Sequence, residues 1–230
     1  MEASATPELR GQAIRSMLQF QIFVAFIIFL SAWSLRFWQG WLYWFVFSAA
    51  VWWITLYFLK HDPHLIEGRM KAGPSAERQT TQKIIQAMAA VLAAALVIVP
   101  GLDHHFEWSS VSATTVLIAD AMVAQGFAII FRVFRENSFA ASTIKVESEQ
   151  RVISSGPYRL VRHPMYSGAS IVLLATPLAL GSLWGVLIAL ALVAVIVVRL
   201  LDEERYLAAN LAGYEAYRKE VKYRLIPRVW

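Results

Sequence analysis

The chain has 230 residues, of which 58% are apolar and only 16% are charged, a balance that lies outside the range of soluble globular domains. Its formal net charge of +5 could suggest nucleic acid as a partner, but the basic residues are grouped between apolar runs, so no nucleic-acid partner is expected. The sequence contains no cysteine, which excludes disulfides, thiolate catalysis and thiolate metal sites.

Six apolar stretches are candidates for crossing a membrane. A hydrocarbon layer roughly 30 Å thick requires about 20 residues of helix at about 1.5 Å per residue. The stretches predict an all-α, polytopic membrane helical bundle of about six crossings, whose last two helices form a hairpin. One integral membrane domain over residues 1–230 follows, with a four-helix part at 17–131 and a loop, hairpin and tail at 132–230. The stretches cover residues 17–35, 41–59, 84–99, 113–131 and a hairpin at 166–201 that is broken at 181–185.

The basic residues fall on alternate connections between these stretches. With six crossings they share one side with both chain ends, and only Arg36 lies on the other side. The connection over 100–112 carries Asp103, His104, His105 and Glu107 but no Lys or Arg. The positive-inside rule therefore predicts a multi-pass membrane protein with both termini in the cytoplasm.

The first motif lies just before the fifth apolar stretch. Residues 156–168 read Gly-Pro-Tyr-Arg-Leu-Val-Arg-His-Pro-Met-Tyr-Ser-Gly. Pro157 and Pro164 disfavour helix at the residue before each, so 156–163 should be a stiff, irregular segment, with Pro164 in the first turn of the next helix. Tyr158, His163 and Tyr166 then bring hydrogen-bonding groups, a near-neutral titrating group and aromatic faces to the point where the chain enters the membrane.

The second motif lies at the end of the sixth stretch, where Arg199 is followed by Asp202, Glu203 and Glu204. Arg199 and Glu203 are four residues apart and share one helix face, and the hairpin returns this face to the same membrane surface as His163. Ionisable groups so close to hydrocarbon are candidates for a functional site. A pairing of Arg199 with Glu203 that only completes the helix is equally compatible with the spacing.

Taken in order, these motifs resemble the isoprenylcysteine carboxyl methyltransferase family of integral membrane enzymes, and its bacterial-type members in particular. The resemblance covers roughly residues 137–227. An Asp-Pro-x-Leu element at 62–65, followed by Arg69, is similar to one found in many bacterial members. The motifs that carry the resemblance are Gly-Pro-Tyr at 156–158, Arg-His-Pro-Met-Tyr at 162–166, the hairpin, Arg199, Glu203-Glu204-x-x-Leu207 and Arg-Leu-Ile-Pro at 224–227.

The resemblance implies a methyltransferase that uses S-adenosylmethionine and acts on a lipophilic acceptor from the bilayer, in a bacterial inner membrane. The acceptor group could be a carboxylate, a thiol or an amine. A phospholipid N-methyltransferase is one alternative, an NADPH-dependent membrane sterol or enone reductase is a second, and a non-enzymatic scaffold or transporter is a third. The sequence specifies neither the acceptor nor the oligomeric state.

The same resemblance assigns site residues. Arg199 and Glu203 are the implied catalytic residues, with Arg199 facing the acceptor and His163 acting as a base or as a hydrogen-bond donor to the cofactor. No metal is expected, because His61 and His64 are better explained as part of a solvated loop. The implied cofactor-binding residues, in a pocket on the cytoplasmic side, are Gln150, Arg151, Val152, Ile153, Tyr158, His163, Pro164, Met165, Tyr166 and Glu203.

Overall fold

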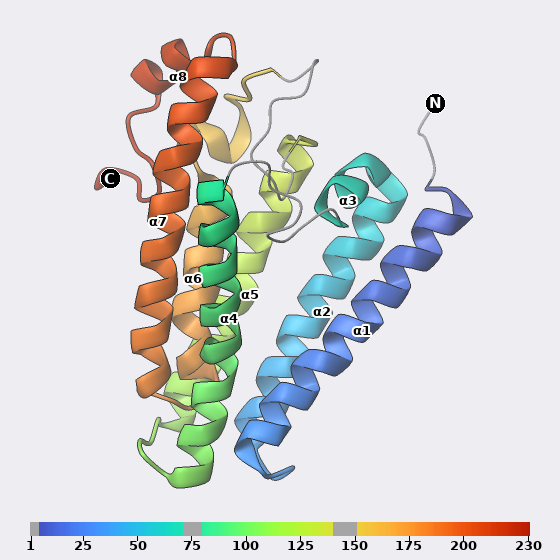
Figure 1. Ribbon diagram of the computed structural model, residues 1–230, viewed down its shortest axis with the longest axis vertical. Helices are drawn as coiled ribbons and strands as arrows, with labels where there is room; N and C mark the ends of the chain where they lie inside the picture. Colours follow the sequence, from blue (N-terminus) through green and yellow to red (C-terminus); the bar gives the residue numbers. More distant parts are fainter. Residues whose placement is uncertain (1–4, 71–79, 140–150) are drawn as a thin grey trace.

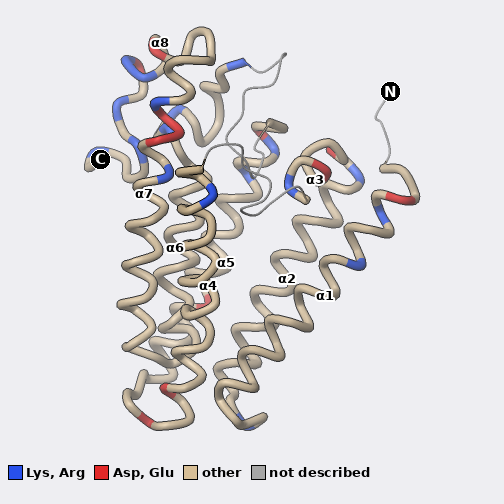
Figure 2. Tube along the Cα trace, viewed as in Figure 1, with Lys and Arg blue, Asp and Glu red and all other residues tan. Residues whose placement is uncertain are grey.

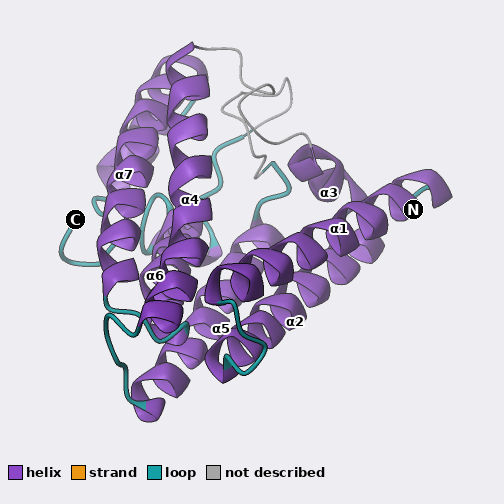
Figure 3. Ribbon diagram, turned by 60° about the horizontal axis from the view of Figure 1, so that its bottom comes forward, coloured by secondary structure: helices purple, strands orange, loops and turns teal. Residues whose placement is uncertain are grey.

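The computed structural model describes residues 5–70, 80–139 and 151–230, and its helices pack as one bundle (Figure 1). The described residues contain no β-strand (Figure 3), which confirms the predicted all-α class. The helices in chain order are α1 (Pro7–Ala32), α2 (Trp38–His61), α3 (Pro63–Met70), α4 (Thr80–Phe106), α5 (Ala113–Glu136), the 3₁₀ helix η2 (Gly156–Arg159), α6 (Pro164–Ala179), α7 (Trp184–Asn210) and α8 (Tyr214–Glu220).

Five helices, α1, α2, α4, α5 and α7, are long and apolar enough to cross a membrane. Their outer surfaces carry large exposed apolar side chains such as Ile22, Phe45 and Trp53, which suits contact with lipid. Helix α6 has 16 residues, or about 24 Å at about 1.5 Å per residue, and is shorter than the hydrocarbon layer. It packs against α5 and α7 and forms the predicted hairpin with α7. The chain is a polytopic integral membrane protein.

The two ends of the bundle differ in charge. Figure 2 shows Lys and Arg gathered at the end that carries α3, α8 and both chain termini, which we call the basic end. This is the asymmetry that the sequence predicts, because six passes of the chain along the bundle return both termini to one end. The placement of the basic end in the cytoplasm stays a prediction.

At the opposite end, the predicted connection over 100–112 is wrong in part. Helix α4 contains Pro100 and continues to Phe106, so His104 and His105 are helical. Asp103 is buried and accepts hydrogen bonds from Ser109 N and Oγ, both at 2.7 Å, and from the Ser182 hydroxyl in the turn between α6 and α7. These contacts stabilise the last turn of α4. The sequence does not predict this turn, because a proline followed by polar residues is typical of a loop.

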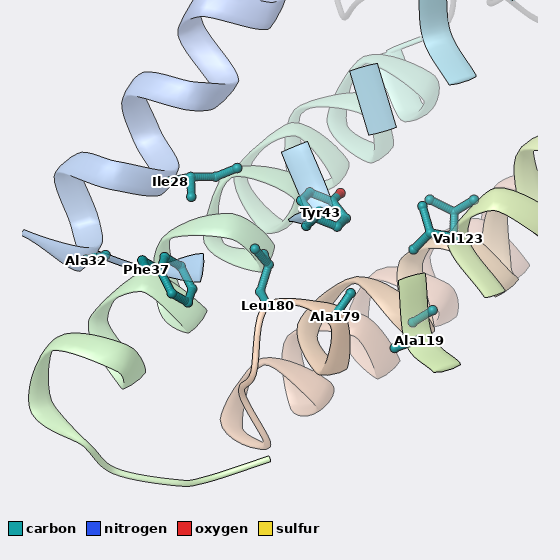
Figure 4. Close-up of a cluster of buried hydrophobic side chains, with 10 residues drawn as sticks. Ile28, Ala32, Phe37, Tyr43, Ala119, Val123, Ala179 and Leu180 are labelled. Atoms are coloured by element: carbon teal, nitrogen blue, oxygen red, sulfur yellow. The ribbon is translucent and has the colours of Figure 1, made fainter. Parts of the chain in front are cut away.

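The membrane-embedded core lies where α1, α2, α5 and α6 meet. Figure 4 shows its side chains, among them Ile28, Phe37, Tyr43 and Val123, all at most 4% exposed. The Tyr43 hydroxyl lies 3.2 Å from the hydroxyl of Thr176, so a polar pair is satisfied inside this apolar cluster. The core fixes α6 against α5 and thereby sets the position of the segment before α6.

Two glycines allow α5 and α6 to approach each other closely. A Cβ atom built on Gly126 would lie 2.6 Å from Val172 Cγ2 and 2.8 Å from the carbonyl oxygen of Gly168. A Cβ atom on Gly168 would lie 2.9 Å from the carbonyl oxygen of Gly126. Small residues at such a crossing let two membrane helices gain van der Waals contact along their backbones.

We expect Gly126→Ala to destabilise the protein by about 1–3 kcal/mol, because the added methyl overlaps the backbone of α6. The matched control is Gly11→Ala in α1, where nothing lies within 4 Å of the new methyl and helix propensity favours alanine. Thermal unfolding in detergent measures both. Equal Tm values for the two variants would contradict the close packing of α5 and α6.

Candidate active site

The connection from α5 to α6 has the stiff, irregular form that its prolines predict. Gly156, the first residue of η2, has a φ of +54°, a conformation that favours glycine. Ser155 donates to the carboxylate of Glu136 at the end of α5. Helix α6 then begins at Pro164, as predicted. The segment is therefore held against α5 at one end and built into α6 at the other.

Tyr158 is fixed within this segment by two hydrogen bonds. Its hydroxyl accepts from Asn137 Nδ2 at 2.8 Å, and its carbonyl accepts from the hydroxyl of Tyr217 in α8 at 2.8 Å. Burial raises the pKa of Tyr158 to about 12, so the phenol stays protonated at neutral pH. Tyr158 can serve the site as an aromatic face and a hydrogen-bonding group, but not as a charge.

The carboxylate of Glu204 contacts three side chains near the start of α6. Its side chain is 5% exposed and accepts from Arg162 Nε at 2.6 Å and from Arg224 Nε at 2.9 Å. His163 Nε2 lies 3.2 Å from the same carboxylate. Because an ionised carboxylate can only accept, Nε2 carries the proton of His163 in this contact. Glu204 thus joins α7, the segment before α6 and the C-terminal tail.

The backbone of the tail follows the same segment. Arg162 N donates to the carbonyl of Tyr223 at 2.8 Å, and His163 N donates to the carbonyl of Arg224 at 3.0 Å. Ser167 Oγ donates to the carbonyl of Leu225 at 2.7 Å. The Arg-Leu-Ile-Pro part of the motif order therefore has a structural role, since its carbonyls accept from a backbone N–H that precedes α6 and from the Ser167 hydroxyl.

The second group of polar side chains is centred on Tyr166. The Tyr166 hydroxyl donates to Glu203 Oε2 at 2.7 Å and accepts from Arg199 Nε at 3.2 Å. Tyr166 therefore lies between the two residues whose spacing placed them on one helix face. These three residues are brought together from α6 and α7, as the hairpin predicts.

Gln82, near the start of α4, completes this group. It is 1% exposed, accepts from Arg199 Nη1 at 2.9 Å through Oε1, and donates to Asp202 through Nε2. Nothing in the sequence distinguishes it, because it is one of three glutamines within residues 79–86, and its partners lie more than 100 residues away. Only the contact between α4 and α7 could reveal it.

The Asp-Pro-x-Leu element forms α3 and approaches the start of α6. Asp62 Oδ1 accepts from Leu65 N at 3.1 Å, and Pro63 is the first residue of the helix. Arg69 Nη1 lies 3.8 Å from Met165 Sδ, and the Arg69 guanidinium lies 4.5 Å from the centre of the Phe134 ring. Burial lowers the pKa of Arg69 to about 10, so it remains a cation beside α6.

The remaining residues that the resemblance assigns do not join the group around Tyr166. Val152 packs against the cluster of Leu211, Tyr214, Tyr217 and Val221 around α8. Arg151 is exposed, Ile153 is half-buried, and Gln150 lies outside the described residues. Pro164 faces a groove on another side of α6. The structure therefore brings Tyr166, Arg199 and Glu203 into one group, and His163 into a second group around Glu204.

In the ranges 5–70, 80–139 and 151–230, no three His, Asp or Glu side chains are grouped as a metal site would need. His61 instead has Nδ1 2.7 Å from the carbonyl of Tyr57, within the last turn of α2. The chemistry available to the described site is that of carboxylates, guanidinium groups, an imidazole and phenols.

Comparison with known proteins defines the class. The family model described as phospholipid methyltransferase matches residues 114–212, from the start of α5 to just beyond α7. The matched range holds Tyr158, Tyr166, Arg199 and Glu203, whereas a search of curated proteins finds no match. A polytopic helical bundle with this match is a membrane methyltransferase.

The match covers less than half of the chain and shows similarity to the phospholipid methyltransferase family, to which the isoprenylcysteine-type membrane methyltransferases are similar. The resemblance to membrane methyltransferases that the motifs indicated is confirmed. The bacterial type of the chain stays a prediction.

Proposed function

We propose that the chain transfers a methyl group from S-adenosylmethionine to a lipophilic acceptor at the basic end of the bundle, which faces the cytoplasm of a bacterial inner membrane. The observation that carries the proposal is the group of Tyr166, Arg199 and Glu203, held together by hydrogen bonds of 2.7 and 3.2 Å. The cofactor would supply a methyl group on a positively charged sulfur. An aromatic ring and a carboxylate side by side suit such a cation.

Each residue in the group has a distinct role in this proposal. Glu203 and the ring of Tyr166 hold the charged end of the cofactor, and Tyr158 supplies a second aromatic face. Arg199, anchored by Gln82, faces the acceptor. Because the hydrogen bonds fix these side chains before binding, the rate gain comes mainly from alignment of donor and acceptor, an effect that reaches about 7–11 kcal/mol in well-oriented systems.

Among acceptors, the family match favours the amine headgroup of a phospholipid. An amine must lose a proton, and Glu203 is the nearby carboxylate that can accept it. His163 lies instead in the group around Glu204, where its Nε2 is 3.2 Å from that carboxylate. A carboxylate or thiolate acceptor would arrive ionised and would need no base, and Arg199 would then bind its charge.

The test is a transfer assay with an identified product. Purified protein in detergent is incubated with S-adenosylmethionine that is labelled on its methyl group and with a total membrane lipid extract, and the labelled product is identified. We expect a methylated lipid, with a phospholipid amine as the favoured product. A parallel binding measurement with NADPH separates the reductase alternative. Binding of NADPH without binding of S-adenosylmethionine would overturn the proposal.

Glu203→Gln is expected to weaken cofactor binding about tenfold, or roughly 1.4 kcal/mol, because it removes the charge and keeps the shape. Calorimetry in detergent gives the Kd directly. The control is Glu215→Gln, which removes the same charge from an exposed side chain of α8. An unchanged Kd for Glu203→Gln would place Glu203 outside the cofactor pocket.

A further inference from the structure

A groove of about 880 Å³ lies between α5, α6 and the C-terminal tail. Its α6 wall is formed by Ser170 together with Pro164, Ser167, Ile171 and Leu174, of which the last four recur every three or four residues and so share one helix face. None of Tyr166, Arg199 and Glu203 lines the groove. It is therefore separate from the group of side chains to which methyl transfer is assigned.

The groove changes in character along its length. On α5, Arg132 and Arg135 line it near the basic end, and Ile129 lies one turn further into the bundle. On α6, Leu174 is ten residues beyond Pro164, or about 15 Å further from the basic end. Glu136 also lines the basic end of the groove, so two arginines there outnumber one carboxylate. The groove thus has an excess of positive charge where lipid headgroups lie and is apolar at the depth of the hydrocarbon.

The two arginines are available to a ligand. Both are exposed, and neither has an ion-pair partner among the residues that the structure describes. They are three residues apart on α5, so their guanidinium groups can approach one anion from neighbouring turns. Basic pockets between membrane helices on the cytoplasmic side are the kind of site that binds anionic lipid headgroups.

We propose that this groove binds one phospholipid with an anionic headgroup, with the phosphate at Arg132 and Arg135 and an acyl chain along Ile171 and Leu174. A soluble anion would leave the apolar length uncovered, and a lipid without net negative charge would leave the excess positive charge of Arg132 and Arg135 unbalanced. The volume lies within the range of about 300–1,000 Å³ of ligand pockets. The proposal is independent of the methyl-transfer function.

A bound lipid would also cover apolar surface at the rim. Leu160 and Ile226 line the groove and are 62% and 54% exposed. Leu160 belongs to the segment that carries Tyr158 and His163, so the lipid would contact the segment that leads into the candidate site. A lipid in the groove would therefore stabilise the segment before α6.

Native mass spectrometry of the purified full chain tests the proposal by titration with phosphatidylglycerol and phosphatidylcholine. We expect one retained phosphatidylglycerol, bound at least tenfold more tightly than phosphatidylcholine. In the double variant Arg132→Gln/Arg135→Gln the two lipids should bind equally. The control is Arg10→Gln/Arg15→Gln, which removes two exposed arginines of α1 near the same end and should leave the preference unchanged. An unchanged preference in the Arg132/Arg135 variant, or no preference in the wild type, would overturn the proposal.

A second pair of variants tests the apolar half of the groove. Leu174→Trp fills it and should weaken the retained lipid at least tenfold, whereas Leu190→Trp, at an exposed site on α7 outside the groove, should not. Equal binding in both variants would overturn the placement of the acyl chain. sn-Glycerol 3-phosphate at the same concentration should not displace the lipid; displacement would show a site for free phosphate instead.

Discussion

Replacing Glu204 with alanine is expected to lower the free energy of unfolding by about 3–5 kcal/mol. The substitution leaves the buried guanidinium of Arg162, 6% exposed, without the carboxylate that lies 2.6 Å from its Nε. Arg224 and His163 lose the same acceptor. Since Glu204 joins α7 to the tail and to the segment before α6, thermal unfolding in detergent should occur at a much lower temperature.

The matched control for this variant is Glu215→Ala. Glu215 also accepts from an arginine, Arg218 Nη1 at 2.9 Å, but its side chain is 60% exposed. Exposed ion pairs contribute only about 0–1 kcal/mol, so its Tm should stay close to that of the wild type. A Tm for Glu204→Ala within a degree or two of the control would mean that the Glu204 carboxylate does not stabilise the packing of α7 against the tail and the segment before α6.

The second large effect is expected for Arg199→Lys, which should lower turnover about 100-fold, or roughly 2.7 kcal/mol, while the Kd of the cofactor stays within about threefold. Arg199 uses two separate nitrogens, Nε toward Tyr166 and Nη1 toward Gln82. The single ammonium of lysine cannot occupy both positions, so the group that faces the acceptor loses its orientation. Turnover assays and calorimetry measure the two quantities separately.

Arg205→Lys is the control for this division of roles. Arg205 lies on the same helix, six residues further on, and is exposed. Its replacement should change neither turnover nor cofactor binding. If Arg199→Lys reduced both by the same factor, Arg199 would be a cofactor-binding residue and its assignment to the acceptor would fail.

Much of the fold could be predicted because it depends on local rules. Long apolar runs indicated the helices, and the glycines at 181 and 185 indicated the turn of the hairpin. The two prolines predicted both the irregular segment and the first residue of α6. The solvated loop predicted at His61 and His64 is wrong, because His61 ends α2 and His64 lies in α3. The physical reason is the cap formed by Asp62, whose side chain accepts from Leu65 N, with Pro63 as the first helical residue.

The rest depended on contacts between distant parts of the chain. Spacing placed Arg199 and Glu203 on one face, but it could not show that Tyr166 lies between them or that Gln82 joins the group. Nor could it show which of two adjacent glutamates is buried. That choice is made by Arg162 and Arg224, which lie 42 and 20 residues from Glu204 and meet it only after the tail packs against α6.

The most direct test of the proposed site is photo-crosslinking of the purified chain to S-adenosylmethionine that is labelled on its methyl group, followed by peptide mapping. We predict label on the peptide that contains Tyr158 and Tyr166 or on the one that contains Glu203, and loss of that label when S-adenosylhomocysteine competes. Competed label confined to residues 100–112, at the end of the bundle opposite the basic end, would contradict the site.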